Sequence, residues 1–168
     1  VYLFSFDDNL FTNPVLQATI GAGYTGGKNI DMAGHLGQDD WFSVPSLSGN
    51  SLAVGAFDDG VINSINNAGS VYLFTFTDAA FNGGNLEGVI GSGYGTSYTA
   101  GAKDFDPGNL HAGDFLYSTS LDGNRLAIGA ANDDGSYNEV EDSGAVYLIS
   151  FSDDVFSNPQ LESIIGAG

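Results

Sequence analysis

The chain of 168 residues contains no cysteine, and it has only three basic residues against 21 acidic ones. The absence of cysteine excludes disulfide bonds, thiolate metal sites and catalysis by a thiol. The formal net charge of −18 repels the phosphate backbone of nucleic acids and anionic membrane surfaces, so we expect neither as a partner. Divalent cations relieve repulsion where carboxylates crowd together, which makes calcium worth considering.

Long apolar runs are also absent. No apolar stretch approaches the roughly 18 residues of a membrane-spanning helix, and no basic segment followed by an apolar one marks a signal peptide. We therefore expect no membrane insertion, and an export signal would lie outside this sequence. The chain begins at Val1 inside a strand-like pattern and ends on Gly168 at a phase of the repeat already met at Gly23. We expect it to be a window of a longer array.

What the sequence does contain is an internal repeat with a step of roughly 70 to 75 residues. The matching segments are 1–6, 71–76 and 146–151; 52–56 and 126–130; and 20–23, 90–93 and 165–168. The chain divides into a partial repeat at 1–23 and two full repeats at 24–93 and 94–168. Because the copies agree over most of the period, we expect an array of one module.

Each full repeat contains four short segments with the β-branched, aromatic and alternating character of strands, and no segment has a helical pattern. The strands are expected at 41–48, 51–57, 70–76 and 86–90, and again at 115–121, 125–131, 145–151 and 161–165. A turn containing Gly-Asn joins the first two strands of each set, as in a tight hairpin. The sequence predicts an all-β fold of four-stranded antiparallel sheets, with a third and fourth strand of a further sheet in residues 1–20.

Antiparallel four-stranded sheets that repeat at this length are typical of β-propeller blades, in which radial packing covers both faces of each sheet. A linear stack of sheets satisfies the same pattern, because each repeat needs only its nearest neighbours. Two and a half blades do not close a ring, which needs at least about four. Either further blades lie elsewhere in the polypeptide, or the modules form an open array that associates lengthwise into a filament.

Three segments of each repeat carry a resemblance to a known family. They are 120–130, 133–135 and 143–148 in the second full repeat, and 46–56, 58–60 and 69–73 in the first. This pattern resembles the FG-GAP repeat of integrin-α-type β-propellers, in the version found in tandem in large bacterial secreted or surface proteins, and it covers essentially the whole chain. The resemblance implies a propeller-type fold, an extracellular or cell-surface location and a role in cell adhesion or in a biofilm matrix.

One departure from this family concerns calcium. Integrin-type blades carry their calcium ligands in an acidic loop between the first and second strands, and here that loop is only a short turn at 47–51 or 121–125. The calcium site of the family is therefore not carried over residue by residue.

The acidic loop after the second strand is the better candidate for calcium. Its oxygen-bearing residues correspond between the repeats without insertion or deletion: Asp58, Asp59, Asn63 and Asn67, and Asp133, Asp134, Asn138 and Asp142. Hard oxygen ligands on a turn of constant length are what a calcium site uses. The alternative is a solvated turn, in which the carboxylates accept local backbone hydrogen bonds.

Other polar and aromatic residues favour structural roles. The acidic residues ahead of the first strands are Asp39, Asp40, Asp104, Asp106 and Asp114. We expect them to make turns, although they could bind a cation or pair with Lys28 and Lys103, which align with each other. The lone loop histidines, His35 and His111, are not expected to be ligands.

The aromatic residues Tyr24, Trp41, Tyr94 and Tyr98 suit either a carbohydrate-stacking platform or, as we expect, caps on the edges of the sheets. We expect no enzymatic activity. The carboxylates recur with the repeat, as structural features do, and Arg125 stands alone where a sialidase-type propeller needs an arginine cluster. No nucleophile-elbow pattern is present.

Together these observations predict a structural or adhesive repeat segment of a large bacterial extracellular protein, stiffened by calcium in its acidic loops. Its partners would be neighbouring repeats or copies of itself. The alternative is a closed β-propeller that binds a glycan or a protein ligand.

Overall fold

The structure is a computed structural model that describes residues 1–59, 67–95, 103–135 and 140–167. Over these residues the regular secondary structure consists of β-strands, and no segment is helical, which confirms the expected all-β class. Accordingly, no helix in the described part of the chain is long and apolar enough to cross a membrane.

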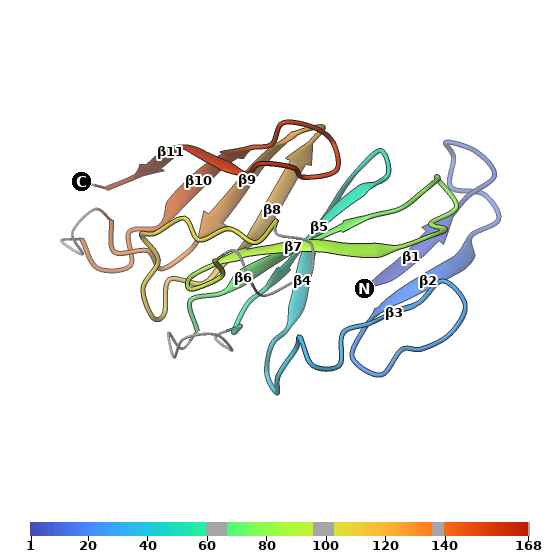
Figure 1. The fold of residues 1–168 in the computed structure, drawn as a ribbon, viewed down its shortest axis with the longest axis horizontal. Coiled ribbons are helices and arrows are strands. Elements are labelled where there is room, and N and C mark those ends of the chain that lie inside the picture. The colour runs from blue at the N-terminus through green and yellow to red at the C-terminus, as the bar shows by residue number, and fades with distance from the viewer. Residues whose placement is uncertain (60–66, 96–102, 136–139, 168) are drawn as a thin grey trace.

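The strands form three open sheets that follow one another along the longest axis of the molecule, with the second sheet between the other two (Figure 1). The first sheet contains β1 (Tyr2–Ser5), β2 (Val15–Gly21) and β3 (Ile30–Asp31). The second contains β4 (Phe42–Ser48), β5 (Ser51–Ala56), β6 (Ser70–Thr75) and β7 (Asn85–Gly91). The third contains β8 (Leu116–Asp122), β9 (Arg125–Ala130), β10 (Ala145–Ser150) and β11 (Gln160–Gly166).

The second and third sheets confirm the predicted four-stranded antiparallel arrangement, with strands that follow one another in the chain also adjacent in the sheet. Residues 1–20 supply an antiparallel pair, β1 and β2, as expected. The third and fourth strands of all three sheets share one irregularity. The register shifts between Leu3 and Phe4, between Leu73 and Phe74, and between Leu148 and Ile149. The repeat is therefore reproduced down to a single β-bulge.

One feature of the first sheet was not predicted. The short strand β3 pairs in parallel with β2, and in the next repeat Phe105 makes an isolated parallel bridge to Ile90 of β7. Each full repeat thus begins by adding to the outermost strand of the preceding sheet.

The middle strands of the second sheet, β5 and β6, are buried on both faces because their side chains alternate between two cores. Leu52, Val54 and Tyr72 pack toward the first sheet, in a cluster that includes Ile20. The residues that alternate with these along the strands face the third sheet, and they are Ala53, Val71, Leu73 and Ile90. The apolar character of β5 and β6 on both faces is explained by this position between neighbours.

The first strands of the second and third sheets lie side by side. Thr119 donates its hydroxyl to the Val44 carbonyl at 2.5 Å, and the Leu121 amide donates to Ser46 Oγ at 2.8 Å. Close approach of the two sheets requires a glycine on β5. A Cβ added at Gly55 would lie 1.7 Å from the carbonyl oxygen of Tyr117 in β8. The contact is therefore between backbone and backbone, with no room for a side chain.

Candidate functional site

The loop after β5 is anchored by a buried aspartate. Oδ2 of Asp59 accepts hydrogen bonds from the hydroxyls of Ser70 at 2.5 Å, Tyr72 at 2.7 Å and Tyr94 at 2.8 Å. Burial, reinforced by the negative charge of Asp59, raises the pKa of Tyr72 far above its ordinary value. The tyrosine hydroxyl therefore stays protonated and acts as a donor, and the carboxylate ties the loop to β6.

The third sheet repeats this anchor with Asp133. Its Oδ2 accepts a hydrogen bond from the Tyr147 hydroxyl at 2.6 Å, and its Oδ1 accepts one from the Gly135 amide at 2.8 Å. Burial and the hydrogen bond to Asp133 raise the pKa of Tyr147. The backbone matches too, since the Gly144 amide donates to the Asp133 carbonyl as the Gly69 amide does to the Asp59 carbonyl.

This geometry corrects the correspondence drawn from the sequence. Ala56 pairs with Ser70, and Ala130 pairs with Ala145, so the position three residues after each alanine is Asp59 in one sheet and Asp133 in the other. The sequence had matched Asp58 with Asp133 and assumed loops of constant length. The loop of the third sheet is instead one residue longer, and the extra residue falls before the glycine that precedes the next strand.

The remaining candidate calcium ligands divide into described and undescribed residues. Asn67 and Asp142 share a left-handed backbone, with φ of 60° and 52°, and the Asp142 amide donates to Asp134 Oδ1 at 2.7 Å. Asn63 and Asn138 lie outside the described residues. Among the residues that are described, no group of three or more acidic or histidine side chains is placed to hold a metal ion. Asp59 and Asp133 act here as hydrogen-bond acceptors within a turn, and calcium stays a prediction.

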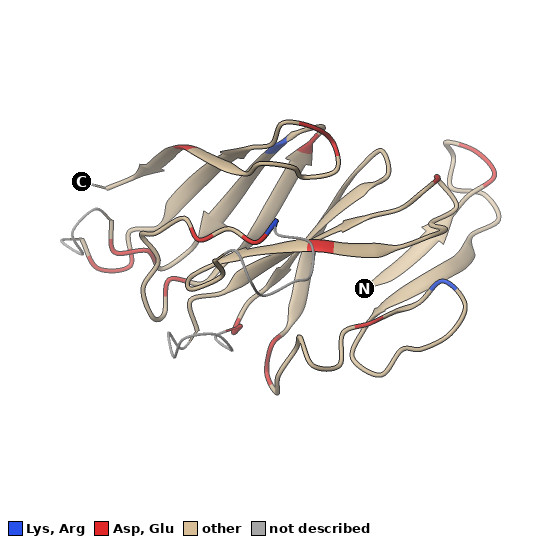
Figure 2. Ribbon diagram, in the orientation of Figure 1, with Lys and Arg blue, Asp and Glu red and all other residues tan. Residues whose placement is uncertain are grey.

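The aspartates that lead into the first strands lie near these anchors. Asp40 Oδ2 accepts a hydrogen bond from the Gly37 amide at 2.5 Å, and Asp114 Oδ2 accepts one from the His111 amide at 2.6 Å. Burial raises the pKa of both carboxyls, and the charge of the neighbouring anchor adds to the effect. Acidic residues therefore gather beside the buried carboxylates, mostly in loops (Figure 2).

The two upstream aspartates, Asp104 and Asp106, accept backbone hydrogen bonds, and that of Asp106 from Gly108 is a local turn bond. The Val89 amide donates to Asp104 Oδ1 at 3.0 Å. Asp106 accepts hydrogen bonds from the amides of Gly93 and Gly108 at 2.9 and 2.8 Å. These bonds attach the start of one repeat to the fourth strand of the preceding sheet.

Two lysines connect consecutive sheets at equivalent positions. Lys103 Nζ lies 2.5 Å from Glu87 Oε2 on β7 and donates at 2.6 Å to the Val155 carbonyl, in the loop between β10 and β11. Lys28 donates to Gln17 Oε1 on β2 at 2.7 Å and, at 2.6 Å, to the Ala80 carbonyl in the loop between β6 and β7. The sequence had offered aspartates as partners for these lysines. The signal that was missed is that Gln17 and Glu87 are polar residues at matching positions of the fourth strands.

The aromatic candidates that the structure describes differ in exposure, and Tyr24 is 43% exposed. Tyr94 is 2% exposed and donates to Asp59, whereas Trp41 is 63% exposed. Phe57 stacks on Phe115 with ring centroids 4.3 Å apart, and Trp41 stacks loosely on the other side of Phe57 at 6.4 Å. The stack bridges the second and third sheets, as an edge cap does. Tyr98 lies outside the described residues.

Comparison with known proteins found no matching protein-family model, curated protein or solved structure.

Proposed function

We propose that this chain is a structural segment of a tandem-repeat protein of the bacterial cell surface or extracellular matrix, in which each sheet assembles with its neighbours. The observation that carries this proposal is the recurrence of the same contacts between consecutive sheets. Lys28 and Lys103 each join the fourth strand of one sheet to the loop between the third and fourth strands of the next. Contacts that are reproduced from sheet to sheet are what an array of one module needs.

The surface chemistry supports a role in assembly. Repeated burial of sheet faces holds neighbouring modules together, while the formal charge of −18 keeps their outer loops apart and soluble. The mechanism is therefore apolar packing between sheets, limited by electrostatic repulsion between loops. Added salt screens such repulsion and favours association.

Sedimentation and negative-stain imaging over a range of protein and salt concentrations test this proposal. We expect extended, filament-like assemblies whose proportion rises with ionic strength. A protein that remains monomeric under all these conditions would contradict assembly between copies, and compact rings would favour a closed propeller.

Calcium enters the proposal through the loops after β5 and β9. Thermal unfolding in calcium, in excess chelator and in magnesium tests it. We expect a higher melting temperature with calcium than with magnesium, because a rigid oxygen cage distinguishes the two ions. Identical melting curves in calcium and chelator would remove calcium from the account.

The second candidate is a module that binds a glycan or protein ligand, and the exposed ring of Trp41 favours it. Trp41 is the single tryptophan of the chain, so its fluorescence reports on that surface alone. Titration with a panel of oligosaccharides is expected to shift this emission if the ring stacks on a sugar, and Trp41→Phe serves as the blank. No shift with any sugar, together with an empty glycan array, would exclude carbohydrate binding at this ring.

A further inference from the structure

The outer face of the third sheet repeats a surface that is buried elsewhere in the molecule. In the second sheet, Val71 and Ile90 are completely buried by the third sheet. Their equivalents, Val146 on β10 and Ile165 on β11, are 36% and 60% exposed. The rest of this outer face is Ala127, Gly129 and Leu148, whose equivalents in the second sheet are buried. The third sheet thus exposes the apolar set that the second sheet buries against β8.

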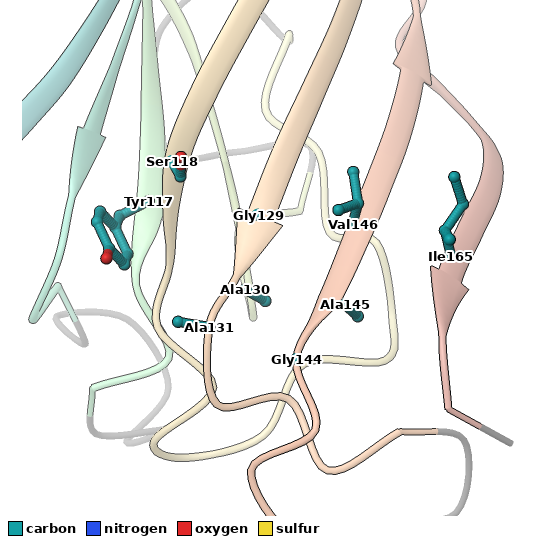
Figure 3. A pocket seen from close by; sticks show the side chains of 9 residues that line it. All are labelled: Tyr117, Ser118, Gly129, Ala130, Ala131, Gly144, Ala145, Val146 and Ile165. Atoms are coloured by element: carbon teal, nitrogen blue, oxygen red, sulfur yellow. The ribbon is translucent and has the colours of Figure 1, made fainter.

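This face is hollowed at the place where a strand would sit. A groove of about 410 Å³ is lined by Gly129, Gly144, Val146 and Ile165 among other residues (Figure 3). Gly129 is the equivalent of Gly55, the glycine that permits the backbone of β8 to approach the second sheet. A Cβ at Gly129 would meet only the side chain of Ser118, at 3.3 Å. The glycine of the docking contact is therefore present on β9, and no strand of the described part of the chain occupies the place over it that β8 occupies over Gly55.

A carboxylate on β11, the strand that carries Ile165, matches the lysine contact of the preceding interface. On β7, Glu87 accepts the hydroxyl of Thr75 at 2.5 Å and binds Lys103, which precedes β8. On β11, Glu162 accepts the hydroxyl of Ser150 at 2.5 Å in the same way, and it is exposed. Both lysines of the chain are engaged elsewhere. Glu162 therefore offers an acceptor for a lysine that comes with the docking strand.

We propose that the outer face of the third sheet is a docking site for a further module of this repeat, seated through a first strand like β8 and a lysine like Lys103. The inference rests on the proposed function, and it concerns the contact between one module and the next module of an array, which is distinct from the contacts between complete copies that imaging tests. Its support is continuity with the interface between the second and third sheets, together with the apolar groove and the charge at Glu162.

The geometry also restricts how such a module begins. In a complete second copy, β1 and β2 precede β4 and form the third and fourth strands of the sheet before it. Suppose that β4 of the second copy lay in this groove as β8 lies on the second sheet. The β1 and β2 strands of that copy would then occupy the same space as β10 and β11 of the first copy. The occupant is therefore a module that starts with its first strand, without a partial sheet ahead of it.

The docking strand can be supplied as a synthetic peptide with the sequence of residues 103–123, which contains Lys103 and all of β8. Because the chain has no cysteine, Val146→Cys introduces a single thiol at the groove. We expect saturating peptide to slow the reaction of this thiol with a maleimide severalfold. Val15→Cys, at a position 51% exposed on the first sheet, is the matched control and should react at an unchanged rate.

Two glycine substitutions in the Val146→Cys background test whether the peptide backbone binds over Gly129. Gly129→Ala places a Cβ where the peptide backbone must approach, so protection should be lost. Gly95→Ala, at a glycine with no atom within 4 Å of an added Cβ, should leave protection intact.

The lysine contact is tested separately. Glu162→Gln in the chain and Lys103→Gln in the peptide should each weaken protection, and the two together should weaken it little further.

Each outcome decides the inference. Equal reaction rates at Val146→Cys with and without peptide, equal slowing at Val15→Cys, or full protection in Gly129→Ala would overturn it. These results are independent of the imaging of assembly. Filaments that form while the peptide fails to protect would leave the proposed function standing and place the contact on another surface.

Discussion

At the scale of single residues, Asp59 and Asp133 perform the same task with different sets of donors. Asp59 accepts three hydroxyl hydrogen bonds, including one from Ser70. In the third sheet Ala145 occupies the position of Ser70 and has no hydroxyl, so Tyr147 is the side-chain donor to Asp133 within the described residues. The two anchors should therefore respond differently to loss of the tyrosine.

Removal of the tyrosine hydroxyl should affect the two anchors differently. Tyr147→Phe leaves Oδ2 of a buried carboxylate without its donor, and we expect it to lower the free energy of unfolding by about 1–3 kcal/mol. Tyr72→Phe should cost about 1 kcal/mol or less, since Ser70 and Tyr94 still donate to Asp59. Urea denaturation of the two variants measures the difference, and equal losses would argue against this view of the anchors.

The raised pKa of Asp114 makes a prediction about pH. Because burial and the nearby carboxylate of Asp133 raise this pKa, the folded protein binds a proton more readily than the unfolded chain. The charged form therefore costs stability at neutral pH, and that cost disappears as the pH falls through the raised pKa. Asp114→Asn keeps an oxygen for the His111 amide and should raise the melting temperature at pH 7.

The advantage of Asp114→Asn should shrink as the pH is lowered toward the aspartate range, near pH 4. Melting curves of both proteins between neutral and acidic pH measure it. A difference that stays constant with pH would show that the carboxyl of Asp114 does not titrate in this environment as described.

At the scale of elements, the loop between the third and fourth strands is the most faithfully repeated part of the chain. Asp8, Asp78 and Asp153 each accept two backbone amides in the loop. Hydrogen bonds, chiefly from Thr12, Asn82 and Ser157 respectively, lower the pKa of each carboxyl. The loops also share an edge-to-face phenylalanine pair with centroids 5.0–5.1 Å apart. Local bonding of this kind forms without help from a neighbouring sheet.

The glycine on the second strand is an element-scale feature that depends on the neighbour. Gly55→Ala forces a Cβ against the Tyr117 carbonyl, and we expect a loss of about 3 kcal/mol or more in the free energy of unfolding. Gly129→Ala is the matched control at the equivalent place on β9, where the groove is open, and it should cost less than about 1 kcal/mol. Denaturation curves provide both values. Similar losses in the two variants would mean that strand conformation, and not the sheet contact, requires glycine.

At the scale of the whole molecule, the lysine contacts join consecutive sheets through residues that are distant in the sequence. Burial alone would raise the pKa of Glu87, but hydrogen bonds from Asn85, Lys103 and Thr75 hold it below the ordinary value. The folded state is therefore favoured while Glu87 is ionised, and this contribution fades as the pH falls through its lowered pKa. The contact contributes at neutral pH and is lost in acid.

A double-mutant cycle measures this contact. Lys103→Gln and Glu87→Gln should each lower the free energy of unfolding by about 1–3 kcal/mol, and the double variant should lose less than the sum. Lys28→Gln is the comparison, and it should cost less because the partner of Lys28 is the neutral amide of Gln17. Strict additivity at Lys103 and Glu87 would indicate that the two side chains act independently.

Much of this architecture could be predicted from the sequence because its causes are local. The alternation of apolar and polar residues with period two, the Gly-Asn turns and the recurrence of the same segments identified β4–β11 to within a residue or two of their ends. The burial of β5 on both faces agrees with the small and apolar residues at 52–56. These local patterns were sufficient for the conclusions, since the residues of each strand and turn carry the pattern themselves.

Only the tertiary structure decided which residues meet across sheets. The pairing of Ala56 with Ser70 and of Ala130 with Ala145 aligned Asp59 with Asp133, because a loop can take up one extra residue without moving the strands it connects. The partners of Lys28 and Lys103, and the parallel addition of β3 to β2, likewise depend on how consecutive sheets are placed. The sequence determined the strands of each module, because the alternation of residues lies within the strand itself. Packing between modules determined the contacts between sheets, because such a contact requires two sheets in a defined arrangement.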